Sequence, residues 1–438
     1  MLCHTKHDTH LAARMPVAFL NNKTRTEIGM GIKQKLRKMV GDGYRVCTLH
    51  FLYPFLYRRY AAKPVKKNKV VFLEVRQQGL SDNFQMLYEQ LEEKKKYDLK
   101  VCCIGEGMQG YWRTIRSCLA ALGELADAEY IFVNDSSYFT GCLPLRKETQ
   151  MIQTWHACGA FKKFGYSTAG KKFGTDRKQL DRFPLHRNYS FVTVSSPEVV
   201  WAYAEAFHME SEQEKILPIG ISRTDCFYRP ENIRAAKERL KNILEEGLAA
   251  GEAEKNAGFE GKKVILYAPT FRGKVADARS PEVLDFRKMR EALGEDYLFL
   301  CKHHPFVKKR PQIPEECRGY ALDVTDRMSI EDLLMVSDVC ISDYSSLVFE
   351  YSLFERPMIF LAPDLEEYYD WRGFYYSYRE MAPGPVVRST EEVVRCLQEL
   401  EKGFDRQRVR AFRERFMSAC DGHATERLIQ LIEDGEMV

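Results

Sequence analysis

Short apolar runs alternate with amphipathic segments along most of the chain after residue 65. In the first half, these runs predict buried strands at Val70–Val75, Leu99–Ile104, Tyr130–Val133, Ile152–Trp155, Phe191–Val194 and Ile216–Ile219. In the second half, similar runs predict strands at Val264–Ala268, Tyr297–Cys301, Tyr320–Val324, Val339–Ser342 and Met358–Leu361. Several of the intervening segments have helical spacing, as at Asp82–Glu93. This alternation is typical of α/β proteins whose parallel sheets carry helices on both faces.

A charged segment, 229–261, separates the two sets of strands. It is rich in Glu, Lys and Ala, which favours a helical linker. We therefore expect an N-terminal domain over 65–228 and a C-terminal domain over 262–438. The predicted fold is a pair of Rossmann-like, doubly wound domains facing a cleft, with ligands at the carboxyl ends of the strands.

Residues 1–64 differ in character from the rest of the chain. Basic residues lie between apolar residues that recur at helical spacing, namely Ile32, Leu36 and Val40. The largely apolar and aromatic run Val46–Tyr57 follows, is broken by Pro54, and ends at Arg58 and Arg59. Aromatic side chains suit the headgroup layer of a bilayer, and basic side chains suit its anionic lipids. This basic amphipathic leader is therefore predicted to be a membrane-surface anchor, and the alternative is a helix that packs on its own domain.

The distribution of charge supports attachment to an anionic surface. Residues 1–70 contain fifteen Lys and Arg against three Asp and Glu, so they carry +12, and the remainder carries −8 of the net +4. The aromatic leader favours a membrane over nucleic acid, so we expect no nucleic-acid partner. No apolar stretch approaches the roughly 20 residues of a membrane span. Thirteen cysteines without disulfide-framework spacing indicate reduced thiols and therefore a cytoplasmic protein. Together with the predicted anchor, this indicates a peripheral protein at the cytoplasmic face of the cell membrane.

The stretch Ile341–Tyr351 combines a strand end, a serine-rich turn and the start of a helix. Residues Ser342–Ser346 would form a tight turn whose hydroxyls and unpaired N–H groups point to one place. A helix N-terminus offers free donors and a partial positive charge, which suit a phosphate. Ser345 and Ser346 are thus candidate phosphate ligands, and the alternative is that Ser345 only caps the helix.

Further polar clusters follow other predicted strands. His156 precedes a glycine turn and could be a general base, or it could only bond a loop carbonyl. Thr270 and Arg272 leave the first strand of the second domain, where a guanidinium suits a phosphate. At the end of the next strand, His303 or His304 could donate to phosphate oxygens.

Three more candidates lie near helix starts. Glu350 is one helical turn beyond the serine turn and could bind the ribose hydroxyls of a nucleotide. Thr425 and Arg427 enter the last helix and could bind the same phosphates. Solvated loops or plain helix caps are the alternatives for these clusters. No Walker loop or Asp-x-Asp metal motif occurs, which argues against P-loop kinase chemistry, so diphosphate stabilisation would fall to these side chains. We assign no metal ligand and no cofactor, and a metal requirement stays open.

One glycine pattern points to a different ligand. Gly105-Glu-Gly107-Met-Gln-Gly110 follows a predicted strand and matches the dinucleotide fingerprint, with Asp135 at the end of the next strand. The strand is the second of its domain instead of the first, and the spacing to Asp135 is long. A loop that lets helix and strand pack closely is therefore the favoured interpretation.

The phosphate-binding candidates belong to a longer series of stretches in fixed order: Gln153-Thr-Trp-His156, Phe161-Lys-Lys-Phe-Gly165, Gly220-Ile-Ser-Arg-Thr-Asp225, Leu266-Tyr-Ala-Pro-Thr270-Phe-Arg272, His304-Pro305, Ser342-Asp-Tyr-Ser-Ser346, Asp364-Leu-Glu-Glu-Tyr368, Arg372-Gly-Phe374, and Asp421-Gly with Glu426-Arg427. This series resembles the CDP-glycerol glycerophosphotransferases of teichoic-acid synthesis, which include related ribitol-phosphate transferases. The resemblance covers most of the chain after the basic leader.

The resemblance implies a fold of the GT-B type and a membrane-associated cytoplasmic enzyme. Such an enzyme transfers an alditol phosphate, with glycerol phosphate expected first, from CDP-glycerol or CDP-ribitol to a hydroxyl of a lipid-linked acceptor and releases CMP. By this resemblance, His156 is the base that deprotonates the acceptor, and His304 contacts the donor phosphates. The residues that would hold the diphosphate are Thr270, Arg272, Ser345, Ser346 and Arg427.

The sequence departs from the family pattern at Ala157-Cys158-Gly159, at Ser222 and at His303. These departures bear on the identity of donor and acceptor. Glycerol or ribitol as the alditol, and a primase or a polymerase as the activity, stay open. One alternative is a sugar-nucleotide glycosyltransferase of surface polysaccharide synthesis with the same architecture, and another is a non-catalytic membrane-bound scaffold.

Overall fold

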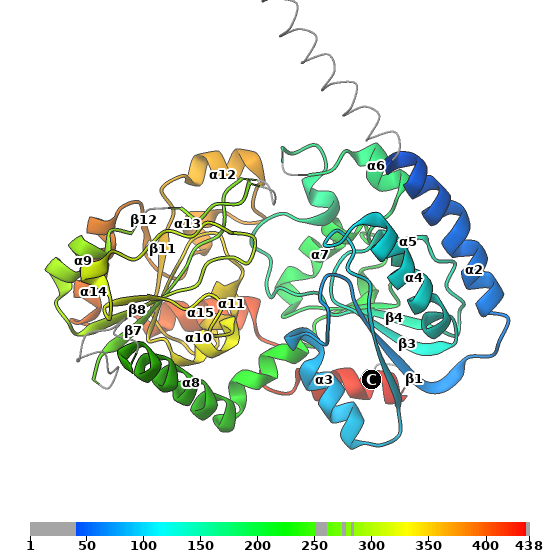
Figure 1. Ribbon diagram of the computed structural model, residues 1–438, viewed down its shortest axis with the longest axis horizontal. Coiled ribbons are helices and arrows are strands. Elements are labelled where there is room, and N and C mark those ends of the chain that lie inside the picture. The colour runs from blue at the N-terminus through cyan, green and yellow to red at the C-terminus, as the bar shows by residue number, and fades with distance from the viewer. Residues whose placement is uncertain (1–40, 173, 250–260, 274–276, 282–283, 435–438) are drawn as a thin grey trace, which may run out of the picture.

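The computed structural model describes residues 41–172, 174–249, 261–273, 277–281 and 284–434, which fold into two α/β domains (Figure 1). The first contains β1 (Lys66–Glu74), β2 (Asp98–Cys103), β3 (Ala128–Val133), β4 (Gln150–Gln153), β5 (Phe191–Thr193) and β6 (Ile216–Leu217). The second contains β7 (Lys263–Ala268), β8 (Tyr297–Cys301), β9 (Ala321–Asp323), β10 (Val339–Ser342), β11 (Met358–Leu361) and β12 (Val386–Val387). All the predicted strands are confirmed, whereas β12 was missed because two apolar residues are too short a run to identify a strand.

Both sheets have the strand order of a doubly wound fold. The order is β2-β1-β3-β4-β5-β6 in the first sheet and β12-β11-β10-β7-β8-β9 in the second. Neighbouring strands pair in parallel in both sheets. In each, the first strand lies inside the sheet and later strands extend to both sides of it. This reversal opens a crevice at the carboxyl ends of the strands, as the sequence predicted.

Helices cover both faces of each sheet. In the first domain they are α3 (Asp82–Glu93), α4 (Tyr111–Ala126), α5 (Tyr138–Cys142), α6 (Arg177–Arg182) and α7 (Val200–Phe207). In the second they are α9 (Phe286–Leu293), α10 (Ile330–Val336), α11 (Leu347–Ser352), α12 (Leu365–Trp371), α13 (Tyr378–Met381) and α14 (Thr390–Leu400). On β1, Val70 and Phe72 pack in one apolar cluster with α3, while Val71 and Leu73 pack on the opposite face with α4. Strands buried on both faces are continuous apolar runs in the sequence.

The end of the leader packs on the first domain. A π-helical segment, η1 (Val46–Leu52), continues directly into α2 (Tyr53–Tyr60), so Pro54, which interrupts the apolar run, does not interrupt the helix. Proline is tolerated there because it lies in the first turn of α2. Tyr53 and Tyr57 are buried beside α4, whereas Phe51 and Phe55 are exposed. The helix expected before residue 41 lies outside the described residues, and no helix within them is long and apolar enough to cross a membrane.

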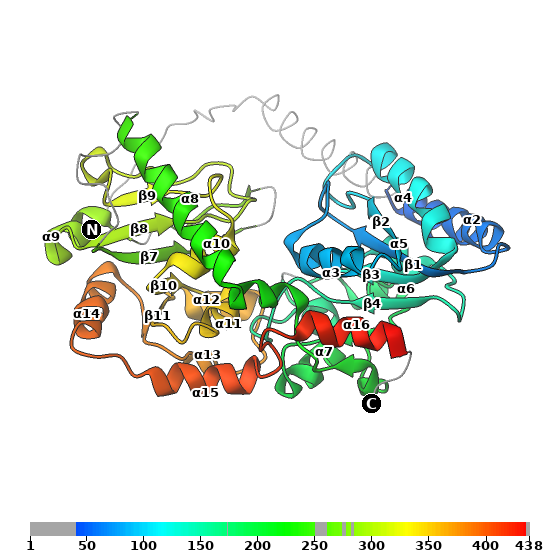
Figure 2. The same ribbon diagram turned by 90° about the horizontal axis from the view of Figure 1, so that it is seen from below.

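Two connections cross between the domains. The helix α8 (Pro230–Ala249) lies in the predicted linker and packs on α10. Figure 2 shows α15 (Arg406–Phe416) beside the second sheet and α16 (Ala424–Asp434) beside the first. Leu428 and Ile432 join the apolar cluster of β1 and α3, and the Tyr130 hydroxyl donates to the Ile432 carbonyl at 2.7 Å. The helix α16, which belongs to the predicted C-terminal domain 262–438, therefore covers the first sheet.

Candidate active site

A cavity of about 640 Å³ lies between the two domains. Its walls include the loops that follow β4, β7, β8 and β10. The carboxyl ends of parallel strands meet at one edge of each sheet, and the two edges face each other here. Seven of the residues predicted from the sequence line this cavity: His156, Thr270, His303, His304, Ser345, Ser346 and Glu350.

His156 presents a basic nitrogen to the cavity. Its Nδ1 lies 2.9 Å from the backbone carbonyl of Asn134. A carbonyl only accepts hydrogen bonds, so Nδ1 carries the proton, and Nε2 of the neutral ring keeps its lone pair. The side chain is exposed and lines the cavity. The bond to a loop carbonyl, which was predicted as the alternative to a catalytic role, is therefore present. It holds the proton on Nδ1 and leaves Nε2 able to act as a base.

The serine turn divides into a structural part and a part that faces the cavity. Ser342 donates to the carbonyl of Ala268 at 2.7 Å, so it ties the end of β10 to the end of β7. Ser345 Oγ accepts from the N–H of Leu347 at a long 3.4 Å, which is a weak cap. Both Ser345 and Ser346 line the cavity, and α11 begins directly after them. Their hydroxyls are therefore available to a ligand.

Thr270 and Arg272 leave β7 in different directions. Thr270 is 8% exposed, lines the cavity, and its Oγ1 has no hydrogen-bond partner among the described residues. Arg272 does not line the cavity; its guanidinium lies 2.9 Å from Asp343 and 2.9 Å from Asp364. It also donates to the carbonyl of Thr270 at 2.6 Å. Arg272 thus positions the loop of Thr270, and its role as a diphosphate ligand stays a prediction.

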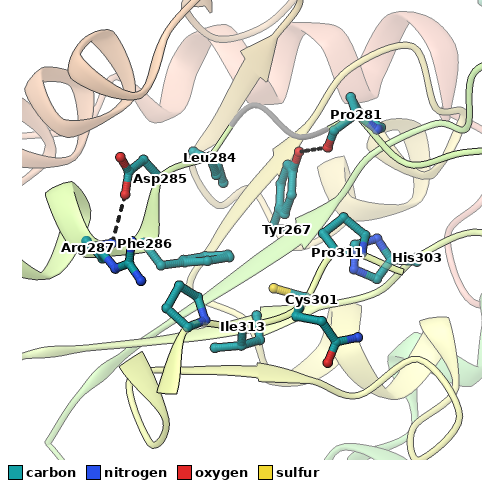
Figure 3. A pocket seen from close by; sticks show the side chains of 12 residues that line it. Tyr267, Pro281, Leu284, Asp285, Phe286, Arg287, Cys301, His303, Pro311 and Ile313 are labelled. Carbon is teal, nitrogen blue, oxygen red and sulfur yellow. Dashed lines mark hydrogen bonds between the residues drawn. The ribbon is translucent and has the colours of Figure 1, made fainter. Parts of the chain in front are cut away.

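The two adjacent histidines have different partners, although both line the cavity between the domains. His303 Nδ1 lies 2.7 Å from the Ser280 hydroxyl, and its ring borders a second cavity of about 400 Å³ with Tyr267 (Figure 3). His304 borders the cavity between the domains, and its Nδ1 accepts from the N–H of Phe306 at 3.2 Å. Burial lowers the pKa of His304 to about 4, so the ring is neutral near pH 7. Its Nε2–H can then donate to an anion.

Glu350 forms an ion pair across the cavity that the sequence did not reveal. Its carboxylate meets Arg223 from η5 (Ser222–Tyr228) in the first domain, and Arg223 also lies 3.4 Å from Glu331. Burial raises the pKa of Glu350 to about 7, against the opposing effect of the Arg223 charge. A ribose hydroxyl would share Glu350 with this arginine, and the ribose contact stays a prediction.

Thr425 and Arg427 lie away from the cavity. Thr425 is fully buried, and its hydroxyl lies 2.8 Å from that of Ser222. Arg427 pairs with Asp421 at 2.7 Å and donates to the carbonyl of Ile219 at 2.8 Å. Both residues hold the C-terminal crossing to the first domain. In this arrangement they do not reach a ligand in the cavity, and their predicted contact with the diphosphate stays untested.

Sequence reasoning assigned no role to four basic residues that line the cavity: Lys162, Arg223, Lys302 and Arg372. Three of them lie in stretches that carried the family resemblance and Lys302 directly precedes His303, but residue type and spacing gave no role for them. Arg372 Nε donates to the carbonyl of Lys163 at 2.9 Å, which joins α12 to the loop after His156. These residues add positive charge to the cavity.

The glycine loop 105–110 lies outside this cavity. Gln109 Nε2 donates to the carbonyl of Ile104 at 2.9 Å, and Glu106 accepts from the N–H of Tyr138 at 3.0 Å. Side chains of the loop itself therefore satisfy polar groups at the strand end. This arrangement is typical of a loop that packs helix against strand.

Comparison with known proteins places these features in one family. The model of the CDP-glycerol:poly(glycerophosphate) glycerophosphotransferase family matches residues 55–434. The chain is 37% identical to a teichoic acid ribitol-phosphate primase of Bacillus spizizenii, over 85% of this chain and 92% of the primase. It is 30% identical to a teichoic acid glycerol-phosphate primase of Bacillus subtilis, over 71% of this chain and 76% of that protein.

A solved structure shares the fold. The wall teichoic acid polymerase TagF superposes with a TM-score of 0.69 at 22% identity, over 94% of this chain and 98% of that chain. This likeness, together with the two parallel sheets, confirms the predicted pair of Rossmann-like domains of the GT-B type. The extent of the family match and the identity to the primases show that the chain belongs to the CDP-glycerol:poly(glycerophosphate) glycerophosphotransferase family.

Proposed function

We propose that the protein transfers an alditol phosphate from a CDP-activated donor to a hydroxyl of a lipid-linked acceptor, releasing CMP, in the synthesis of a teichoic-acid-like polymer. The observation that carries this proposal is that His156 shares one cavity with His304, Thr270 and the serine turn. A base from one domain thus shares the cavity with hydrogen-bond donors from the other, and such donors suit a diphosphate. Family membership supports the same class of reaction.

His156 is the general base in this reaction. Because Nδ1 bonds the Asn134 carbonyl, Nε2 can accept the proton of the acceptor hydroxyl. The hydroxyl oxygen then attacks the phosphorus of the alditol phosphate. The bond between that phosphorus and the bridging oxygen breaks, and CMP leaves with the electron pair of that bond. Negative charge therefore grows on the phosphate of CMP during transfer.

The second domain supplies groups that stabilise this charge. The neutral ring of His304 has an N–H to donate, and the buried Thr270 hydroxyl has no partner in the segments that the structure describes. Ser345 and Ser346 add two hydroxyls at the serine turn. These donors are held in place before the reaction, so little reorganisation is needed in the transition state. Glu350, beside the same turn, is proposed to bind the ribose.

CDP-ribitol is the donor that we test first. The ribitol-phosphate primase shares more residues with this chain than the glycerol-phosphate primase does, and it is covered over 92% of its length. This likeness favours ribitol phosphate over the glycerol phosphate expected from the sequence.

The acceptor would be presented at a membrane surface. Phe51 and Phe55 are exposed along η1 and α2, and Arg58 and Arg59 follow on the same helix. Trp112, at the start of the neighbouring α4, is 84% exposed. Aromatic and basic side chains together suit an anionic lipid surface. We propose peripheral binding to the cytoplasmic face of the membrane through these residues.

CMP release tests the proposed reaction. The purified protein would be incubated with CDP-ribitol or CDP-glycerol and a lipid-linked disaccharide acceptor. Release from one donor alone would identify the alditol. No release from either donor, with CDP still bound, would contradict these donors. A protein that binds UDP but not CDP would favour the glycosyltransferase alternative.

A further inference from the structure

Lys162 lies on the loop that contains His156, in the first domain, but its backbone contacts the second domain. The N–H of Lys163 donates to the carbonyl of Gly373 at 3.0 Å. Lys162 itself pairs with Phe374 in an antiparallel bridge. The residue is therefore fixed where the two domains join, and its side chain lines the cavity between them.

The ammonium of Lys162 has no counter-ion in the part of the chain that the structure describes. The charged and titratable groups that face it are His304 at the end of β8, Arg372 after α12, Asp343 after β10 and Arg272 after β7. Asp343 does not balance the ammonium, because Arg272 already pairs with it at 2.9 Å. The cavity thus contains an amine whose charge, when it is protonated, no described carboxylate neutralises.

A second unpaired group lines the same cavity from the other domain. The Thr270 hydroxyl is more than nine-tenths buried and has no hydrogen-bond partner among the described residues. Buried polar groups are nearly always hydrogen-bonded, so such a group suggests a missing ligand. An ammonium and a buried hydroxyl, both without partners, indicate an anion between the domains.

We propose that Lys162 binds the diphosphate of the CDP-activated donor and so links the two domains through the substrate. This inference deepens the proposed function and rests on it, because that reaction supplies the diphosphate. An ammonium neutralises phosphate oxygens as a compact point charge. The same charge stabilises CMP as the bond to its bridging oxygen breaks.

Donor binding changes the protonation of Lys162. Burial, together with the charge of Arg372, lowers the pKa of the Lys162 ammonium to about 7. A diphosphate beside it favours the charged form and raises this pKa. At pH 8 the free enzyme therefore contains mostly the neutral amine, and binding takes up a proton. His304 contributes little to this uptake, because its pKa of about 4 would have to rise by several units.

Two substitutions at Lys162 and one matched control test the inference. Lys162→Met keeps most of the aliphatic stem and removes the charge, and Lys162→Arg restores a charge that does not titrate near pH 8. Lys163→Met is the control, because the Lys163 ammonium pairs with Glu205 at 3.2 Å and does not line the cavity. Isothermal titration calorimetry with CDP at pH 8, in buffers of different ionisation enthalpy, measures affinity and proton uptake. Melting temperature reports on folding.

We expect Lys162→Met to weaken CDP binding by about 10- to 100-fold, the range for a lost charge-assisted bond, and to abolish the proton uptake. Lys162→Arg should recover much of the affinity without the uptake, and Lys163→Met should retain both. If Lys162→Met does not fold, the loss of uptake in Lys162→Arg decides the question.

The outcomes separate this inference from the proposed function. Wild-type affinity and wild-type proton uptake in Lys162→Met would overturn the inference while CMP release continued to support the reaction. A wild-type protein that binds CDP but releases no CMP would overturn the reaction, and the binding data would still decide the role of Lys162. A wild-type protein that does not bind CDP would overturn both.

Discussion

Removal of Arg223 tests whether an ion pair across the cavity holds the two domains together. Its guanidinium meets Glu350 on α11 and lies 3.4 Å from Glu331 on α10. Arg223→Met would leave Glu350, which is 5% exposed, without its opposing charge. Loss of one partner of a buried pair costs about 3–5 kcal/mol. Protonation of Glu350 limits this cost, because burial already raises its pKa to about 7.

The cost of Arg223→Met should therefore depend on pH. The folded pKa of Glu350 exceeds its unfolded value of about 4.3, so the folded state binds the proton more tightly. Stability then falls as pH rises between the two values, and the full loss is present above the folded value. Without Arg223 the folded pKa rises further, so the variant continues to lose stability above pH 7. We expect a free energy of unfolding lower by about 3 kcal/mol at pH 8, and by about half of that or less at pH 5.5.

Urea denaturation at these two pH values measures the effect. Arg388→Met is the matched control, because Arg388 and Glu366 form a pair whose side chains are 51% and 71% exposed. Loss of such a pair costs less than about 0.5 kcal/mol. Addition of Glu350→Gln to Arg223→Met should restore much of the stability. A loss below about 1 kcal/mol at pH 8, or an equal loss at both pH values, would refute the reasoning.

Three other substitutions probe the cavity and the surface. His156→Ala should lower kcat for CMP release by about 10²- to 10⁴-fold while CDP binding is retained, and unchanged turnover would remove this histidine from the mechanism. Thr270→Val should raise the KM for the donor about tenfold without lowering the melting temperature, because the lost hydroxyl bonds none of the residues that the structure describes; a destabilised variant with an unchanged KM would contradict this. The double substitution Phe51→Ser with Phe55→Ser should reduce flotation with anionic liposomes while the melting temperature is retained, and equal flotation would exclude this surface as the anchor.

The strands could be predicted because parallel strands are buried on both faces. Such strands are continuous apolar runs, and the bounds of β8 and β10 agree with the predicted residues. The last helix was harder to assign to a domain. Leu428 and Ile432 have the spacing of an apolar helix face, but that spacing does not say which sheet the face covers.

The site residues also divide into features that the sequence predicted and features that only the fold decided. His303 and His304 are equivalent in the sequence and both line the cavity between the domains, and only the structure shows that His303 also bonds the Ser280 hydroxyl beside a second cavity. Arg272 was predicted as a phosphate ligand from its residue type. In the fold its guanidinium lies between two carboxylates, one of them on Asp364, far along the chain.

The sequence by itself determined the class of fold, the order of its strands along the chain and the family to which the chain belongs. It also identified seven residues that line the cavity, because polar residues directly after parallel strands collect at one sheet edge. Only the tertiary structure decided which charges are neutralised by protein partners and which are left for a ligand. Lys162 and Arg223 show this difference, since within the described part of the chain the first has no counter-ion and the second has two carboxylates. The reason is that these distances depend on how the two sheets pack together, and no local pattern of residues records that packing.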